Sequence, residues 1–163
     1  MSLPLTAYLH DHLAGSNFAI ELLERMRDQH AGQPIGQFAA SELGLLLRDR
    51  DILLRILDRV GSEESVFKQA AAWVAEKASR FKLKNSGPEA FEIFESLELL
   101  AVGIHGRAAL WRVLAVIALL DHRLQGEDYE SLAEEARQQH DRVERRRLDI
   151  APSALTSANT PAH

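Results

Sequence analysis

The 163-residue chain contains no cysteine. That absence excludes a disulfide framework, a thiolate zinc site, iron–sulfur ligation by cysteine and a cysteine nucleophile. The chain also lacks an excess of positive charge, because it has 19 Lys and Arg and 24 Asp and Glu, which gives a net charge of −5. Since a dedicated nucleic-acid binder usually carries a basic excess, we expect no nucleic acid among the partners.

Long hydrophobic runs are missing as well. The uncharged stretches of the most apolar segment, residues 99–106 and 113–120, fall well short of the roughly 20 apolar residues that a membrane-spanning helix needs. The opening residues, MSLPLTAYLHDHL, have neither the positively charged region nor the uninterrupted apolar core of a signal peptide. We therefore expect a cytoplasmic protein that has no membrane partner.

Glycine and proline are few, nine and five, and they fall mostly where apolar periodicity ends. The pattern predicts five helices and no strand, at about residues 6–29, 34–61, 63–81, 88–122 and 129–150. Pro34 and Pro88 are suited to first helical positions, and Gly61 to the residue that closes a helix. Thr6 and Asp128 are the expected N-caps.

Long helices joined by short turns are typical of a bundle. The segment 63–81 is amphipathic and lies between the second and third long helices, so it is predicted to be an extra crossover helix. The helix at 88–122 is apolar almost all the way round, which predicts the most buried position. We expect residues 1–150 to form one all-α domain and residues 151–163 to be a flexible tail.

Several polar side chains fall in the predicted core-facing sectors when each helix is projected at 100° per residue. They are His12, Glu42, Asp49, Glu98, His105 and His140. Burying a carboxylate costs several kcal/mol unless it is paired, hydrogen-bonded or bound to a cation. One interpretation is a structural network, because Arg112 and Arg147 project into the same interior and could neutralise two of the acids. The other is a metal site, since oxygen and nitrogen ligands suit iron or manganese.

Other polar residues are assigned to the surface. His10 projects to the polar side of the first helix. The arginines at 142 and 145–147 form a basic cluster near the end of the last helix, where the helix dipole favours cations. That position predicts a solvated helix end rather than a nucleic-acid site.

Three strings, YLHDHLAGSNFAIELLERM, AAAWVAEKASRFKLKN and ESLELLAVGIHGRAALWR, resemble an uncharacterised bacterial branch of the ferritin-like superfamily. The resemblance covers nearly the whole chain. It implies a ferritin-like four-helix bundle with a long crossover between the second and third core helices, and it places the helix at 63–81 in that crossover.

The di-iron members of that superfamily use one Glu on each of two helices and Glu-x-x-His on each of the other two. The resemblance lets Glu42, Glu98 and His140 stand for three of the six ligands. Leu45 and Arg137 occupy positions where the motif has His and Glu, so neither Glu-x-x-His is intact and the di-iron motif is degenerate. Asp49 and His105, one heptad further along their helices, could complete a shifted site.

Two functions follow from these patterns. The favoured one is a structural or interaction protein with no enzymatic activity and no cofactor. We expect a homodimer, because the nearly all-apolar helix at 88–122 needs more cover than three amphipathic neighbours give. The alternative is a metal-dependent oxidoreductase or metal-storage protein that binds iron or manganese in the core. Its ligands would be Glu42, Asp49, Glu98, His105 and His140.

Overall fold

The computed structural model describes residues 3–61 and 87–156. Within these residues it contains four α-helices, one short 3-10 helix and no strand, so the predicted all-α bundle is confirmed. The elements are α1 (Leu3–Gln29), α2 (Pro34–Val60), α4 (Glu89–Ile117), η1 (His122–Leu124) and α5 (Tyr129–Leu155). The helix predicted at 63–81 lies outside the described residues, as do residues 157–163 of the predicted tail.

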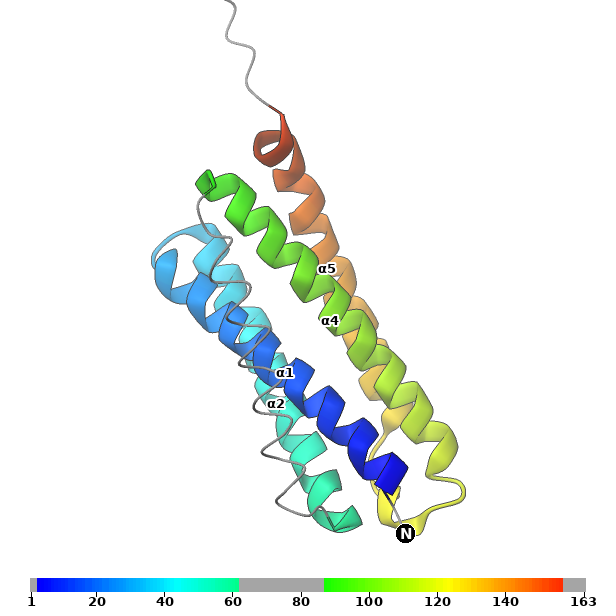
Figure 1. Ribbon diagram of the computed structural model, residues 1–163. Helices are drawn as coiled ribbons and strands as arrows, with labels where there is room; N and C mark the ends of the chain where they lie inside the picture. The colour runs from blue at the N-terminus through cyan, green and yellow to red at the C-terminus, as the bar shows by residue number, and fades with distance from the viewer. Residues whose placement is uncertain (1–2, 62–86, 157–163) are drawn as a thin grey trace, which may run out of the picture.

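The helices form two antiparallel hairpins that pack side by side, α1 with α2 and α4 with α5 (Figure 1). Two contacts fix how the hairpin ends meet. His30 Nδ1, in the turn after α1, lies 3.2 Å from Glu89 Oε1 at the start of α4. Arg59, near the end of α2, donates a hydrogen bond of 3.2 Å to the backbone oxygen of Gln125, between α4 and α5. Helices α2 and α4 therefore run in the same direction.

Most of the predicted helix ends are confirmed at the glycine, proline or capping residue that indicated them. Gly61 closes α2 with φ +74°, the left-handed conformation that glycine adopts without strain. The side chain of Asp128 caps α5 by accepting a 3.0 Å hydrogen bond from Ser131 N. Thr6 was wrongly predicted as an N-cap, because α1 already begins at Leu3 and the Thr6 side chain is buried.

Two predicted helix ends are wrong. The helix expected to reach residue 122 ends at Ile117, and the Asp121 side chain then caps η1 by accepting from Arg123 N at 3.0 Å. The last helix continues five residues past the expected residue 150, with Pro152 inside it. A proline removes only one N–H from the final turns, and Thr156 N still bonds to Pro152 O at 3.1 Å. Residues 151–155 therefore belong to α5 rather than to a tail.

The hydrophobic core runs the length of the bundle. Its fully buried side chains include Leu9 and Leu23 of α1, Leu53 and Ile56 of α2, Leu97, Ile104 and Trp111 of α4, and Val143 of α5. Burying each such side chain contributes roughly 1.5–3 kcal/mol. Apolar packing thus accounts for the association of the two hairpins.

Helix α4 is not buried on all sides, contrary to the prediction. Phe94 and Ala101 face the core as expected, but Val116 and Leu119, assigned to the same sector, are 65% and 82% exposed. A helix that is apolar on every side has no periodicity to show which face is inward, so the projection placed its core sector wrongly. Among the described residues, α4 is also the one helix long and apolar enough to cross a membrane. Core helices of soluble proteins pass the same test.

Candidate functional site

A cluster of polar side chains, most of them buried, joins α2 to α4 and α5. We call it the polar junction, and its members are Glu42, Arg48 and Asp49 of α2, Arg107 of α4, and Glu135, Gln139 and Arg142 of α5. Glu42 and Asp49 lie on the core-facing side of α2, as predicted.

Asp49 is the most enclosed acid of the polar junction, with 2% of its side chain exposed. Its Oδ1 accepts hydrogen bonds from Arg48 Nε at 3.0 Å and Nη2 at 2.7 Å. Its Oδ2 lies 3.0 Å from Nε of the buried Arg107. Burial lowers the pKa of Arg107, and the neighbouring Asp49 charge opposes that shift. Asp49 is thus the counter-ion that offsets the free-energy cost of burying the Arg107 guanidinium between the hairpins.

Glu42 forms the second ion pair of the polar junction. Its carboxylate accepts two hydrogen bonds from Arg142, at 2.9 and 3.2 Å, in the paired geometry that makes arginine–carboxylate contacts strong. These bonds raise the pKa of Arg142. Gln139 is fully buried beside this pair, where its Nε2 donates to the Glu42 backbone oxygen at 3.1 Å and its Oε1 accepts from Arg107.

The charges of the polar junction cancel. Three acids, Glu42, Asp49 and Glu135, stand against three cations, Arg48, Arg107 and Arg142. The predicted neutralising residues were Arg112 and Arg147, and neither holds these two buried acids. Arg112 is exposed on α4, whereas Arg147 does pair with Glu98, the third of the predicted acids.

Sequence reasoning missed five members of the polar junction, and three of them were missed for different reasons. Arg107 falls three residues after Ile104 and four before Trp111, but α4 is apolar on all sides, so its projection did not show that this position faces inward. Gln139 is uncharged, so its burial did not require an ion-pair partner and the sequence did not single it out. Arg142 was assigned to the solvated helix end, but its long side chain reaches back along α5 to the core.

The other three predicted ligands lie together at a different place. Glu98, His105 and His140 line a cavity of about 470 Å³ between α4 and α5, together with Glu144 and Arg147. The rings of His105 and His140 meet edge to face at 5.8 Å. Glu98 is 55% exposed and His140 31% exposed, so this cavity opens to solvent. The prediction that these three residues face the core is therefore wrong.

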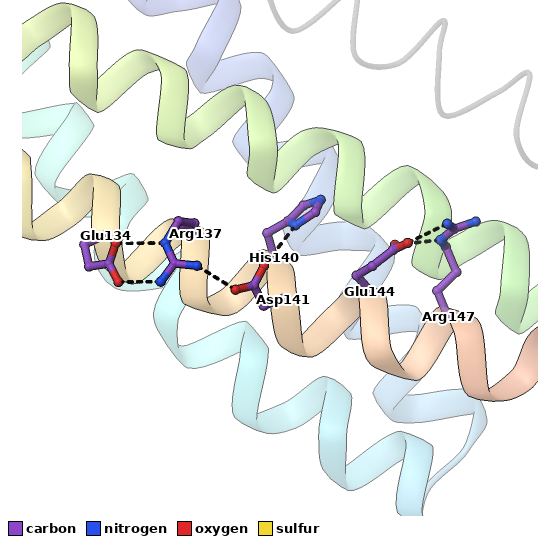
Figure 2. Close-up of polar contacts among 6 residues, drawn as sticks. All are labelled: Glu134, Arg137, His140, Asp141, Glu144 and Arg147. Carbon is purple, nitrogen blue, oxygen red and sulfur yellow. Dashed lines mark hydrogen bonds and ion pairs between the residues drawn. The ribbon is translucent and has the colours of Figure 1, made fainter.

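Arg147 already engages both carboxylates of this cavity. Its Nη1 donates to Glu98 at 2.9 Å. Its Nε and Nη2 donate to Glu144 at 2.8 and 2.7 Å, as Figure 2 shows. The five predicted ligands are therefore divided between a neutralised junction and an open cavity. Over residues 3–61 and 87–156, no group of three or more His, Asp and Glu is placed to hold a metal ion.

One of the two histidines of α1 is not where the sequence predicted it. His10, expected on the polar side, is 2% exposed, and burial lowers its pKa. His12, expected in the core, lines a groove of about 180 Å³ between α1 and α4, opposite Gly103 and Gly106. Burial lowers the pKa of His12 as well. At about 100° per residue the two positions lie on well-separated sides of α1. The projection took the core-facing arc too narrowly, because α1 packs against both α2 and α4 and this arc includes His10 as well.

The outer face of α4 carries an unbroken apolar row. Its members are Leu99, Val102, Gly106, Ala109, Val113 and Val116, spaced alternately by three and four residues. We call this row the apolar face of α4. Val102 is 69% exposed and Val116 65% exposed. A Cβ atom built on Gly103 or Gly106 meets nothing within 4 Å, so packing inside the described chain does not require glycine there.

No protein-family model, curated protein or solved structure matches this chain.

Proposed function

We propose that this chain is a non-enzymatic helical-bundle protein that binds another polypeptide through the apolar face of α4. The exposure of that row carries the proposal. Single exposed apolar residues are ordinary, but a contiguous row along a helix is typical of an interaction site. Alternation by three and four residues also matches the seam along which two helices pack.

The polar junction supports a structural role for the buried acids. Each acid holds an arginine and the charges cancel, so their burial requires no bound cation. We also propose a ferritin-like relationship. It is supported by the parallel directions of α2 and α4 and by the partial match of Glu42, Glu98 and His140 to the di-iron ligands.

Photo-crosslinking in the cells that make this protein tests the interaction surface. Benzoylphenylalanine replaces Val102 on the apolar face, and the matched control carries it at Arg55, an exposed position of α2. We expect covalent protein adducts at Val102 and none at Arg55. Equal labelling at both positions, or no adduct at Val102, would contradict the proposal.

A metal-binding role is the second candidate, and the approach of His105 to His140 in a cavity with two carboxylates is the observation that favours it. The test is metal content by mass spectrometry, on protein grown with iron and manganese and purified without chelator or histidine tag. Near-stoichiometric metal that is lost in Glu98→Ala and retained in Glu21→Ala, on exposed α1 surface, would replace the interaction proposal with this one.

A further inference from the structure

We infer that the groove between α1 and α4 binds a small amino acid, whose carboxylate meets Arg107 and whose ammonium group meets Asp11. The inference goes beyond the proposed function, because Gly106 is the one described residue that belongs to both this groove and the apolar face of α4. Three observations lead to it: the space beside three glycines, a buried arginine nitrogen without an acceptor, and the charges that line the groove.

Glycines form much of the wall of the groove. Gly15 of α1 and Gly103 and Gly106 of α4 line it, and a Cβ atom built on any of the three meets nothing within 4 Å. The open volume is about 180 Å³. Since a cavity of roughly 150 Å³ is enough to hold benzene, the groove has room for a molecule of about six to nine non-hydrogen atoms.

Arg107 supplies the polar contact at the inner end of the groove, where its side chain is 6% exposed. Its Nε lies 3.0 Å from Asp49 Oδ2, and its Nη2 donates to Gln139 Oε1. None of the residues that the structure describes accepts a hydrogen bond from Nη1. Because a guanidinium is planar, Nη1 lies on the edge turned away from those two partners. A buried donor without an acceptor costs free energy, so a ligand oxygen that accepts from Nη1 is favoured.

The charges that line the groove fit a ligand with no net charge. The polar junction behind Arg107 is neutral as a whole, so a lone anion in the groove would leave an excess of negative charge in the core. Asp11 lines the mouth of the groove, where it is exposed. A carboxylate there attracts an ammonium group and repels a second carboxylate. An amino acid presents both charges and satisfies Arg107 and Asp11 together.

The remaining lining residues restrict the side chain of the ligand. Ser16 and His12 add hydrogen-bonding groups, and burial lowers the pKa of His12, so its ring is neutral at neutral pH and does not replace the ammonium group beside Asp11. Ala19 and Leu46 offer apolar contact to a short hydrocarbon chain. The volume is too small for an aromatic amino acid, so we expect a short aliphatic one.

NMR titration of the isotope-labelled natural chain tests the site. The probes are glycine, β-alanine, γ-aminobutyrate and L-valine, and the comparison compounds are butyrate and butylamine, each of which lacks one of the two charges. We expect at least one amino acid to give saturable shifts of the Gly15, Gly103 and Gly106 amide signals. Butyrate and butylamine are expected to bind at least about tenfold more weakly, because each lacks one charge-assisted contact.

A substitution that fills the groove tests its location. Gly103→Val places a side chain in open space and is expected to abolish binding while circular dichroism shows unchanged helix content. Gly44→Val is the matched control, because it makes the same change at an exposed position of α2 that also has open space, and it is expected to bind normally.

Two further variants test the charges. Asp11→Asn is expected to weaken amino-acid binding about tenfold and to leave butyrate binding unchanged or stronger, whereas Glu21→Gln, on exposed α1 surface, changes neither. Asp49→Leu/Arg107→Met removes the cation at the inner end and replaces both partners of the buried pair by apolar side chains, so the fold is expected to survive and binding to be lost.

The outcomes are decisive. No saturable shift with any of the amino acids, as for a groove that holds water alone, overturns the inference. Butyrate that binds as tightly as the amino acids overturns the role of Asp11, and binding that persists in Gly103→Val overturns the location. The photo-crosslinking at Val102 is measured without added amino acid, so failure here leaves the proposed function standing.

Discussion

Removal of Asp49 tests whether the buried acids hold the fold together. Asp49→Ala deletes the counter-ion of Arg107, whose guanidinium stays enclosed between the hairpins with 6% of its side chain exposed. Breaking a buried ion pair in this way costs about 3–5 kcal/mol. We expect about 3 kcal/mol, because Glu42, Glu135 and the Gln139 carbonyl still act on Arg107.

Thermal and urea unfolding followed by circular dichroism measure this effect. For a chain of this length, about 3 kcal/mol lowers Tm by roughly 6–12 °C. Glu98→Ala is the matched control: it removes an exposed partner of an arginine that keeps Glu144, and is expected to cost less than about 1 kcal/mol.

The double variant Asp49→Leu/Arg107→Met separates charge from packing. Replacing both partners of a buried pair by apolar side chains is often neutral, so we expect stability within about 1 kcal/mol of the natural chain. The reasoning is refuted if Asp49→Ala costs no more than Glu98→Ala. It is equally refuted if the double variant is as unstable as Asp49→Ala.

Three further measurements test the packing and the ionisable groups. Burial raises the pKa of Tyr129 from 10.0 to about 12, so ultraviolet titration is expected to show its phenolate forming near pH 12, with the associated stability lost as pH rises from about 10 through 12. The same titration on Tyr129→Phe identifies the signal, and ionisation near pH 10 would contradict the burial. The side-chain hydrogen bond from Arg123 lowers the pKa of Asp121 from 3.8 to about 2, and its stabilising effect is lost as pH falls through about 2. NMR titration is expected to show this midpoint returning towards 3.8 in Arg123→Ala. Gly36→Ala places a Cβ against the His30 backbone oxygen, too close for van der Waals contact, and is expected to cost about 1–3 kcal/mol. Gly44→Ala, with open space, is expected to gain about 0.5–1 kcal/mol in urea unfolding. Equal effects of the two substitutions would contradict the packing at Gly36.

The buried faces of the amphipathic helices were predictable because their apolar residues form a stripe on one side of each helix. In α2, Leu46, Leu53 and Ile56 repeat at helical spacing, and the same stripe contains Glu42 and Asp49. Burial of these two acids could therefore be predicted from α2 alone. The identity of their partners could not, because Arg107 and Arg142 reach them from helices about 60 and 100 residues away in the chain.

Helix α4 shows where the sequence lacks the necessary information. Its residues are apolar on all sides, so no projection distinguishes the side of Ile104 from the side of Val102. Glu98 and His105 were consequently assigned to the core, although they lie on the flank that opens to solvent. The contacts of α4 with α1 and α5 are what distinguish its inner from its outer face.

The distribution of charge in the polar junction has a consequence for how the protein assembles. The α1–α2 hairpin brings Glu42, Asp49 and Arg48, one net negative charge, and the α4–α5 hairpin brings Arg107, Arg142 and Glu135, one net positive charge. The facing surfaces of the two hairpins therefore carry opposite net charge at the polar junction. The Asp49–Arg107 and Glu42–Arg142 pairs form only when the hairpins dock, so a hairpin packed in another register would leave Glu42 and Arg107 without their ion-pair partners.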